Sequence, residues 1–485
     1  MAKDLLKDSI AYTVLGFLPF LFAFFFTPIY LNYMNDEEYG ILNLFLLYTG
    51  IMAQVYGMGV SNAFIYFYWD VYQEKDQLKT LISNTLGLLL FFQIFYISIG
   101  LLFGEKFLPI LVKSSDKFTF NPIFISAIFL SGFMVFYEMF LYFFRNEGKL
   151  KQYSILSISA LILLATGTIT GVVFLDLKAV GAIFGRTFGY GIVVMCFLVY
   201  MIIKYGISFN WKQSKLLFAF SLPLLINAIV GALGSGLDRI LIERLDNLET
   251  LGIYGLALMI ITIIEVWFNS LNNSLTPTLY RYLNESFEQK ANEIKILVHT
   301  LIILVMISII LIIAAINPIL DLFIPESFHE VALYIPILAT AFFWRVFTAM
   351  ATYSLYIEKK TKFLVFNQFT VLVCLGFLGY WGYQFYGIMG IIYAVYFVKI
   401  IEFLVMNYFS KKVKRLNFKL EKLFITAIVT SIAAFICTFY YDNNESNYLL
   451  YLLPLFVFSI ITFLLMRNEL KDISTAIKNR KELFN

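Results

Sequence analysis

Long apolar stretches, separated by short polar segments, run through almost the whole chain. A helix that crosses a bilayer needs about 20 predominantly apolar residues, and fourteen stretches approach or exceed that length. We expect spans near residues 10–33, 40–67, 80–103, 122–144, 153–175, 179–203, 216–236, 251–276, 296–316, 331–356, 363–383, 388–410, 420–440 and 449–466. The pattern therefore predicts an all-α integral membrane protein.

The composition supports this interpretation. Of the 485 residues, 60% are hydrophobic and only 14% are charged, whereas soluble domains are about half apolar and about a quarter charged. An ordinary soluble protein is therefore excluded. Cys196, Cys374 and Cys437 lie singly in apolar stretches, which indicates neither disulfides nor a metal site. Nothing resembles a phosphate-binding glycine loop or a nucleophile triad, so we expect no cofactor and no ATP-driven transport.

Lysines and arginines are distributed unevenly among the loops. An even number of spans places both termini on one side, and cytoplasmic loops are enriched in these cations. If the N-terminus is inside, 27 of the 36 cations lie in cytoplasmic segments and three within spans. The remaining six are Lys106, Lys113, Lys117, Lys178, Arg239 and Arg244, in the opposite loops. We expect both termini in the cytoplasm, with the first apolar stretch a span and not a removable signal peptide.

Short segments of the first half recur about 210 residues later, in the same order. The pairs are YMNDEEYGIL (33–42) with RLDNLETLGIYG (244–255), IYFYWD (65–70) with LYRYLN (279–284), FFRNEGKLKQYSIL (143–156) with LYIEKKTKFLVFNQ (355–368), and KAVGAIFG (178–185) with YGIMGIIY (386–393). We expect six-helix bundles over residues 1–210 and 211–415, with two appended spans and a cytoplasmic tail over 416–485. A cleft between two parallel bundles suits alternating access around a central site.

Six ionisable residues fall within predicted spans, where each costs about 2.5–3.5 kcal/mol and should face protein or water. They are Glu138, Arg186, Glu265, Arg345, Lys399 and Glu402. Lys399 and Glu402 are three residues apart and share a helix face, so they form either a structural pair or part of a substrate site. Glu138 lies near the cytoplasmic end of its span and can reach water.

Arg345 and Glu265 lie near the middle of their spans. We expect Arg345 to bind an anionic substrate group, because a guanidinium holds phosphate in bidentate fashion and keeps its proton. Arg186, nearer the outer third of its span, is a second candidate. Glu265 is either a proton-coupling carboxylate, since burial favours the protonated form, or the counter-ion of Arg345.

Uncharged polar residues and prolines gather at matching places in the two halves. Spans seven and eight hold Asn227, Asn269, Asn272 and Asn273 with Pro223 and Pro277, and spans one and two hold Gln54 and Asn62 with Pro19 and Pro28. Broken helices at matching positions are typical of transporter gates. We interpret these segments as gates, although transmembrane helices also tolerate proline and asparagine without any function.

Four segments carry a resemblance to a known family: NDEEYGILNL at 35–44, RNEGKLKQY at 145–153, LDRILIERL at 237–245 and ETLGIYGLA at 249–257. Together with the six-plus-six-plus-two spans, they resemble the polysaccharide-exporting branch of the multidrug/oligosaccharidyl-lipid/polysaccharide (MOP) superfamily, the Wzx-like oligosaccharide flippases. The resemblance covers essentially the whole chain and implies a MATE-like MOP fold.

The resemblance implies a flippase and not an enzyme. Its substrate would be a polyprenyl-pyrophosphate-linked oligosaccharide, moved to the outer leaflet of the bacterial cytoplasmic membrane for O-antigen, lipopolysaccharide or capsule-type synthesis. Its partners would be membrane lipids and the glycan polymerase and ligase of the same pathway, with no nucleic acid. By chemical type and depth, the expected substrate-binding residues are Arg345, Arg186, Lys399, Asn269, Asn272, Asn273 and Asn62, and the expected ion-coupling residues are Glu265 and Glu402.

Two other functions fit the sequence less well. A drug or cation antiporter of the same superfamily usually has twelve spans and an acidic binding site, and the mid-span Arg345 counts against it. A membrane glycan polymerase or ligase needs a sizeable outward catalytic loop, and the longest outward loop, residues 104–121, is short. A lipid II or sporulation-type flippase of the same branch stays open, because the glycan leaves no mark in the sequence.

Overall fold

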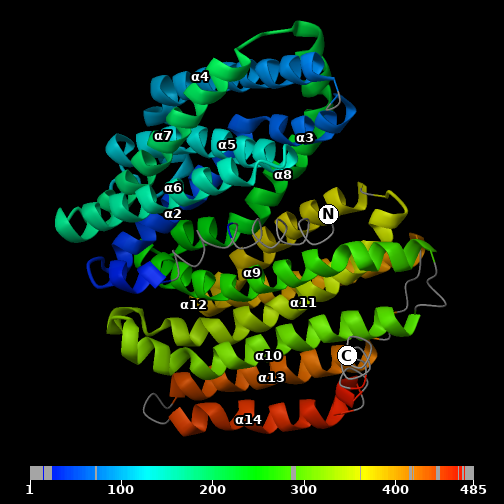
Figure 1. Cartoon of the computed structure of the whole chain (residues 1–485). Coiled ribbons are helices and arrows are strands. Elements are labelled where there is room, and N and C mark those ends of the chain that lie inside the picture. Colours follow the sequence, from blue (N-terminus) through cyan, green and yellow to red (C-terminus); the bar gives the residue numbers. More distant parts are fainter. Residues whose placement is uncertain are drawn as a thin grey trace. The chain divides into compact units, whose positions relative to one another are not determined.

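The computed structural model describes residues 15, 25–71, 74–285, 291–360, 362–413, 418, 420–443, 448–467, 469–471 and 475. Within these residues all regular secondary structure is helical, as the apolar pattern predicts. The elements, coloured along the chain in Figure 1, are α2 (Asp36–Gly57), α3 (Val60–Val71), α4 (Lys75–Leu111), η1 (Phe120–Phe124), α5 (Ile125–Asn146), α6 (Leu150–Ile169), η2 (Thr170–Phe174), α7 (Lys178–Tyr205), α8 (Trp211–Leu245), α9 (Leu248–Glu285), α10 (Ala291–Phe323), η3 (Glu326–Phe328), α11 (Val331–Ile357), α12 (Lys362–Val413), α13 (Glu421–Asn443) and α14 (Tyr448–Leu465).

Eleven helices in this described part of the chain are long and apolar enough to cross a membrane. One of them, α12, is a hairpin, because Tyr386 and Gly387 leave the helical conformation and Gly387 adopts a φ of 56°. The backbones of Gly382 and Gly390 then approach too closely for a side chain on either residue. The hairpin supplies the eleventh and twelfth predicted spans, and α14 supplies the last. The first predicted span lies mostly outside the described residues.

The second predicted span, expected as one helix over 40–67, is broken into α2 and α3. Met58 and Gly59 at the break have φ values of 47° and 66°, which end the first helix. Gln93 of α4 donates from Nε2 to the carbonyl of Tyr56, 3.4 Å away, near the end of α2. The break therefore depends on left-handed backbone at a glycine and its neighbour, and not on the prolines that the sequence analysis emphasised.

The seventh predicted span, expected over 216–236, is too short. α8 continues to Leu245, because Ile240, Leu241 and Ile242 extend its apolar pattern by two further turns. At its start, the Asn210 side chain accepts a hydrogen bond from the backbone N–H of Gln213 at 3.2 Å, which caps the helix. The placement of Arg239 and Arg244 in a loop is therefore wrong, since both lie within α8.

The chain divides by compactness into two units, Met1–Gly255 and Leu256–Asn485. Unit 1 comprises the helices through α8 and the first turns of α9. Its core contains Phe64, Phe140, Phe143 and Phe144, which are fully buried where α3 and α5 meet. The expected organisation as bundles over 1–210 and 211–415, with an appendage over 416–485, stays a prediction.

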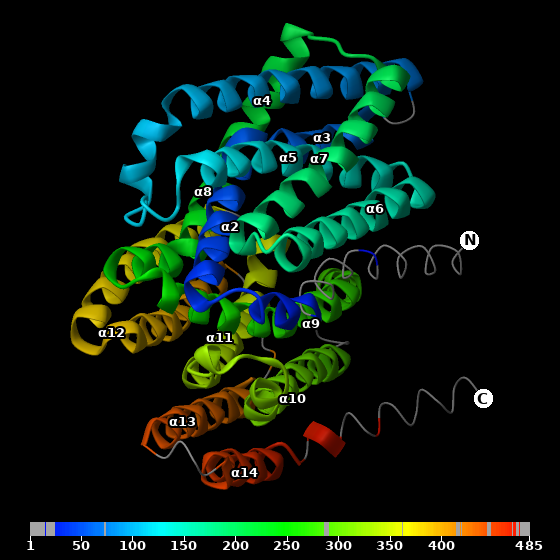
Figure 2. The same cartoon turned by 90° about the vertical axis from the view of Figure 1, so that its left-hand side faces the viewer.

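Unit 2 is built around α11, which is almost entirely buried. Trp344 and Phe347 of α11 pack their rings against Phe403 of α12 and Phe424 of α13, with centroids 5.2 to 5.9 Å apart. On one side of the unit α10, α13 and α14 lie side by side in both views (Figures 1 and 2). This packing holds the helices that carry the charged pairs described below.

Candidate functional site

Two asparagines at equivalent positions of the internal repeat begin two helices of unit 1. Asn35 accepts a hydrogen bond from the N–H of Glu38 at 2.8 Å, and the Glu38 carboxylate accepts one from the N–H of Asn35 at 3.1 Å, so α2 starts with a capping box. Asn247 accepts from the N–H of Thr250 at 2.8 Å at the start of α9. The aligned segments 33–42 and 244–255 therefore start helices in the same way.

The helices that start at these caps touch each other through glycines. A Cβ atom on Gly40 would overlap the carbonyl of Leu248, and one on Gly252 would overlap the carbonyl of Asp36. One turn further, a Cβ on Gly255 would overlap the side chain of Asn43. Because Asp36, Gly40 and Asn43 correspond to Leu248, Gly252 and Gly255 in the repeat, the contact is pseudo-twofold symmetric. We call this end of unit 1, where α2 and α9 begin and α4 and α8 finish, the glycine end.

Ion pairs surround the beginning of α2 at the glycine end. Glu37 pairs with Lys117, from the segment that follows α4. Glu38 pairs with Lys178 at the start of α7, with 3.0 Å between Oε1 and Nζ. The partners of Glu37 and Glu38 are two of the six cations assigned to loops on the side opposite the termini.

The ends of α4 and α8 are joined by hydrogen bonds at the same glycine end. The N–H of Ser114 donates to Glu243 Oε1 at 2.7 Å, and Arg244 donates from Nη2 to the carbonyls of Ile110 and Leu111 at 2.5 and 3.1 Å. Lys113 Nζ donates to the carbonyl of Arg244 at 2.8 Å. The side chains thus satisfy carbonyls that the last turn of α4 leaves free.

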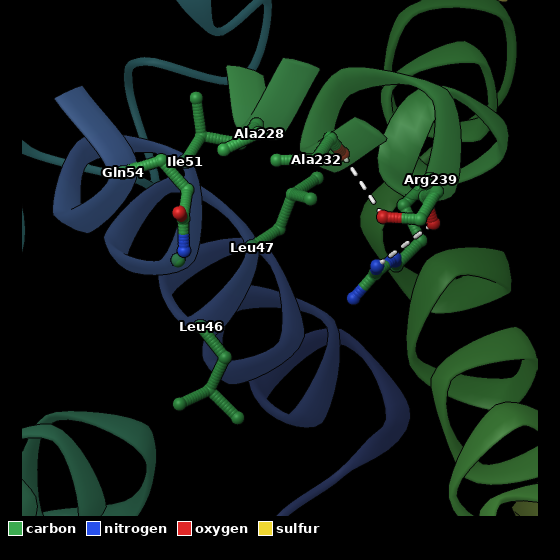
Figure 3. Close-up of a pocket in the computed structure, with 9 residues that line it drawn as sticks. Leu46, Leu47, Ile51, Gln54, Ala228, Ala232 and Arg239 are labelled. Atoms are coloured by element: carbon green, nitrogen blue, oxygen red, sulfur yellow. Dashed lines mark hydrogen bonds between the residues drawn. The ribbon is translucent and has the colours of Figure 1, made fainter. Parts of the chain in front are cut away.

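A cavity of about 430 Å³ lies between α2 and α8. Its wall consists of Leu46, Leu47, Gly50, Ile51 and Gln54 from α2, and Ala228, Ala232, Ser235 and Arg239 from α8. Figure 3 shows Leu47 facing the α8 wall on which Arg239 lies. The cavity combines one cation, an amide and a hydroxyl with apolar side chains, which suits a ligand that has both an anionic and an apolar part.

Arg239 is held by neighbours on its own helix. It donates from Nη2 to the carbonyl of Ser235 at 3.2 Å, and its Nε lies 3.9 Å from Asp238 Oδ1. Asp238 is itself fixed, because its Oδ2 accepts a hydrogen bond from the Tyr254 hydroxyl at 2.6 Å and its Oδ1 one from the N–H of Arg239. The carboxylate is therefore shared, and Arg239 retains donors for a ligand.

Arg186, predicted to bind substrate, lies on α7 close to three phenols. Its charge acts on Tyr30, Tyr39 and Tyr190. Within the described part of the chain no carboxylate pairs with Arg186, and its Nε is buried without a hydrogen-bond partner. Arg186 is therefore a cation whose charge is not neutralised by a described neighbour.

The predicted cations of unit 2 are paired. Arg345 Nη2 lies 2.5 Å from Glu265 Oε1, with side chains 39% and 34% exposed. Lys399 Nζ lies 2.8 Å from Glu402 Oε2, with side chains 31% and 13% exposed. Of the alternatives for Glu265, the geometry favours the counter-ion, and Glu402 also has its cation beside it.

The four predicted asparagines differ in their surroundings. Asn62 of α3 and Asn269 of α9 are exposed. Asn272 accepts a hydrogen bond from the Tyr353 hydroxyl at 2.9 Å, which ties α9 to α11. The side chain of Asn273 lies outside the described residues. Asn62 belongs to unit 1, whereas Asn269 and Asn272 belong to unit 2.

The apolar pattern does not single out three charged residues of α8 as candidate site residues. Asp238 and Glu243 are 6% and 0% exposed, and Arg239 lines the cavity. The segment LDRILIERL spaces its charges four and five residues apart around an apolar triplet, which is a helical pattern. A predicted span that ends before Asp238 does not include this helical pattern.

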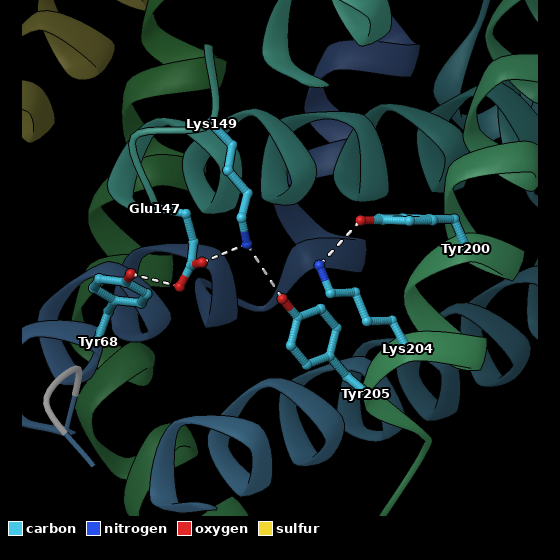
Figure 4. Close-up of polar contacts among 6 residues, drawn as sticks. All are labelled: Tyr68, Glu147, Lys149, Tyr200, Lys204 and Tyr205. Atoms are coloured by element: carbon cyan, nitrogen blue, oxygen red, sulfur yellow. Dashed lines mark hydrogen bonds and ion pairs between the residues drawn. The ribbon is translucent and has the colours of Figure 1, made fainter. Parts of the chain in front are cut away.

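At the opposite end of unit 1, tyrosines surround a half-buried ion pair (Figure 4). Glu147 accepts from the Tyr68 hydroxyl at 2.8 Å and from Lys149 Nζ at 2.5 Å. Lys149 also reaches the Tyr205 hydroxyl at 3.5 Å. Burial alone would raise the pKa of Glu147, but the hydrogen bonds from Lys149 and Tyr68 and the charge of Lys149 hold that pKa below its usual value. We call this the tyrosine end.

Comparison with known proteins supports the fold. A family model described as polysaccharide biosynthesis protein matches residues 5–283, more than half of the chain. No curated protein matches the chain. Among solved structures, the chain resembles the lipid II flippase MurJ in an inward closed conformation, with a TM-score of 0.66 and 15% identity over 96% of this chain and 99% of that one.

Two further structures resemble the chain. One is an inward-facing multidrug resistance MATE family transporter of the MOP superfamily, with a TM-score of 0.60 and 14% identity over 83% of this chain and 95% of that one. The other is a MOP superfamily transporter from Pyrococcus furiosus, described by the reverse polarity of its binding pocket, with a TM-score of 0.50 and 14% identity over 84% and 97%. At these identities the likeness shows the fold alone, and it confirms the predicted MATE-like MOP fold.

Proposed function

Because the chain belongs to the polysaccharide biosynthesis protein family, we propose that it is a flippase for a lipid-linked saccharide. The substrate would be a polyprenyl-pyrophosphate-linked oligosaccharide, moved from the inner to the outer leaflet of a bacterial cytoplasmic membrane. The family match and the structural likeness to a lipid II flippase support this class of substrate. A transporter of this kind makes and breaks no covalent bond.

The observation that carries the proposal is the cavity between α2 and α8, with Arg239 on its wall. A guanidinium within a membrane-spanning helix costs free energy, and such residues are usually functional. An arginine fork binds phosphate groups in bidentate fashion, because two N–H groups meet two oxygens. The apolar part of the wall suits the first isoprene units of the lipid.

Arg186 is the second proposed contact for pyrophosphate, since no carboxylate among the described residues neutralises it. Arg345 and Lys399 stay proposed substrate residues, but each must first leave Glu265 or Glu402. Glu265 and Glu402 accordingly stay proposed ion-coupling residues, released when substrate takes the cation. Asn62, Asn269, Asn272 and Asn273 are proposed hydrogen-bond partners of the sugars.

The place of the protein in the cell is also a proposal. The loop cations favour both termini in the cytoplasm, which would put the glycine end on the outer side. Surface glycans of the O-antigen or capsule type would be the products of the pathway. A glycan polymerase and a ligase would then act on the flipped substrate.

Transport in vesicles tests the function. The purified full-length protein is placed in vesicles, and the fraction of a polyprenyl-pyrophosphate-linked oligosaccharide that an external glycosidase can reach is followed in time. We expect the protein to move the substrate, and Arg239→Gln or Arg186→Gln to slow it about ten- to a hundredfold, the effect of losing a hydrogen bond to a charged group worth about 1.5–3 kcal/mol. Arg145→Gln is the control, because Arg145 is exposed at the tyrosine end.

Two results would contradict the proposal. One is no movement of the oligosaccharide above that in empty vesicles. The other is export of an organic cation driven by an ion gradient, which would identify an antiporter of the same fold. Equal rates for Arg239→Gln, Arg186→Gln and the control would leave the flippase but reject its proposed binding residues.

A further inference from the structure

A second cavity lies in unit 2, where α11, the end of α12 and the start of α13 meet. Its volume is about 510 Å³, which is within the range of about 300–1,000 Å³ that is typical of ligand pockets. The described residues that line it include none of the proposed substrate or ion-coupling residues. The cavity is therefore separate from the site proposed for transport.

The wall of this cavity changes from polar to apolar along its helices. On α12, Asn407 and Lys411 lie one and two turns nearer the end of the helix than Leu404. Seven residues at 1.5 Å each place Lys411 about 10 Å from Leu404 along the axis. On α13, Glu421 is the first residue and Phe424 lies one turn further along the helix. The charged groups thus lie at the edge of the predicted spans and the apolar groups within them, which suits a lipid with its head at the membrane surface.

The apolar part of the cavity has a packed inner side and an exposed outer side. The rings of Phe347, Phe403 and Phe424 pack against one another with centroids 5.8 Å apart. Leu404 and Ile425, which also line the cavity, are 53% and 49% exposed. They belong to helices that are long and apolar enough to cross a membrane. A hydrocarbon chain can therefore enter the cavity from the lipid and pack against the aromatic rings.

Three polar side chains of the cavity have no partner in the described part of the chain. Lys411 and Glu421 carry opposite charges and line the same cavity, yet they form no ion pair with each other or with any other described residue. The Asn407 amide likewise makes no hydrogen bond to a described residue. By contrast Lys422, next to Glu421, pairs with Glu469, with 2.9 Å between Nζ and Oε1. The cavity therefore offers one positive group, one negative group and an amide to a ligand.

We propose that this cavity is a binding site for phosphatidylethanolamine. The phosphate of the headgroup binds Lys411, and its ammonium group binds Glu421 through charge-assisted hydrogen bonds. The Asn407 amide donates to a phosphate or ester oxygen, and one acyl chain lies over Leu404 and Phe424. Basic cavities between spanning helices bind anionic lipid heads, but the carboxylate of Glu421 beside Lys411 changes the preference to a head that carries both charges.

Other lipid headgroups match these charges less well. Phosphatidylglycerol has no cation for Glu421, and its net negative charge is repelled by that carboxylate. Phosphatidylcholine has both charges, but its quaternary ammonium donates no hydrogen bond. A polyprenyl pyrophosphate carries only negative charge at its head, so the proposed transport substrate is also disfavoured here. The inference therefore does not depend on the proposed function.

Native mass spectrometry of the full-length protein in detergent measures the binding of single lipids. Dioleoyl phosphatidylethanolamine, phosphatidylcholine and phosphatidylglycerol are added separately to protein freed of lipid. We expect phosphatidylethanolamine to bind about fivefold more tightly than either of the others, the effect of one ion pair at a partly exposed site. It should also raise the midpoint of thermal unfolding most, because a ligand that binds only the folded state stabilises it. Equal binding of the three lipids, or tightest binding of phosphatidylglycerol, would overturn the proposal.

Charge variants test the two headgroup contacts separately. Glu421→Gln should abolish the preference for phosphatidylethanolamine over phosphatidylglycerol, and Lys411→Gln should weaken the binding of phosphatidylethanolamine about fivefold. The matched controls are Lys412→Gln, at an exposed lysine of α12 outside the cavity wall, and Glu105→Gln, at an exposed glutamate of α4. Both controls should bind lipids as the wild type does. A preference that persists in Glu421→Gln, or an equal loss in Lys412→Gln, would contradict the proposed contacts.

A further variant fills the apolar part of the cavity and leaves both charges in place. Leu404→Trp puts a larger side chain on the cavity wall, and Tyr408→Trp, one turn along α12 at an exposed position outside that wall, is its control. We expect Leu404→Trp to lose the tight binding of phosphatidylethanolamine while its thermal unfolding without lipid stays like that of the control. Wild-type binding in Leu404→Trp would place the lipid elsewhere and overturn the proposal. A protein that passes these tests but moves no oligosaccharide would refute only the proposed function.

Discussion

Gly40 of α2 lies against the carbonyl of Leu248 at the start of α9, and Gly252 of α9 lies against the carbonyl of Asp36 at the start of α2. They occupy the same place in the two copies of an internal repeat, and both lie in unit 1. In a transporter that works by alternating access, such a contact is suited to close one side of the central site.

Gly40→Ala tests the glycine contact. The added methyl group must displace the carbonyl of Leu248, and overpacking of this kind costs about 1–3 kcal/mol. We expect a lower midpoint of thermal unfolding for Gly40→Ala than for the wild type. Gly50→Ala is the control, because nothing lies within 4 Å of its added Cβ, and we expect equal or higher stability. Equal effects of the two variants would contradict the proposed contact.

Variants of the Lys399–Glu402 pair test whether this pair stabilises the fold. Glu402→Leu alone leaves Lys399 in an apolar setting without its partner, so the amount of folded protein in the membrane should fall. The double variant Lys399→Met with Glu402→Leu should restore it, since neither charge remains. Size-exclusion chromatography of the solubilised protein measures the folded fraction. If the double variant is as poorly folded as the single one, the pair is not what stabilises this region.

Arg345 and Glu265 allow stability to be separated from transport. Arg345→Ala leaves Glu265 without its partner and should lower both the stability of the protein and the rate of transport. Arg345→Leu with Glu265→Leu removes both charges and should recover folded protein. If Arg345 binds substrate, the folded double variant still fails to flip oligosaccharide in vesicles. Wild-type transport by the double variant would show that the pair is structural.

The tyrosine end should make stability depend on pH. The pKa of Glu147 is lowered by Lys149 and Tyr68, so the pair stabilises the fold above the usual carboxyl value of 4.5 and loses that contribution as the pH falls through the lowered value. In Lys149→Met the folded-state pKa of Glu147 rises towards its unfolded value, so the stability that this group loses in acid should become smaller. Thermal unfolding as a function of pH measures this difference. Lys151→Met, at an exposed lysine, should follow the wild type; a shift as large as that of Lys149→Met would contradict the assignment.

The membrane fold was predictable because bilayer crossing depends on long apolar stretches, and those are visible in any sequence. The repeat was also visible in the sequence. The caps at Asn35 and Asn247 show that the aligned segments both start a helix. The break between α2 and α3 was not visible, because left-handed backbone at Met58 and Gly59 leaves no regular pattern. α8 runs past the predicted end of its span, because the charged residues Asp238 and Arg239 lie inside the helix and not at its edge.

The sequence predicts the residue types of the candidate site but not the partners of those residues. Mid-span cations were singled out, yet Arg345 and Lys399 have carboxylate partners, one of them from another helix. Partners on other helices depend on packing, which one sequence does not reveal. The burial of Glu243 follows from the way α4 ends against α8, and that contact between distant segments leaves no pattern in the sequence.

The most direct test of the central claim is the amount and leaflet of polyprenyl-linked oligosaccharide in a strain that lacks this protein, compared with its parent. The account predicts that the lipid-linked oligosaccharide builds up on the cytoplasmic face while the surface glycan is lost, and the mass of the accumulated lipid identifies the cargo. An unchanged amount and sidedness, with the surface glycan intact, would contradict it.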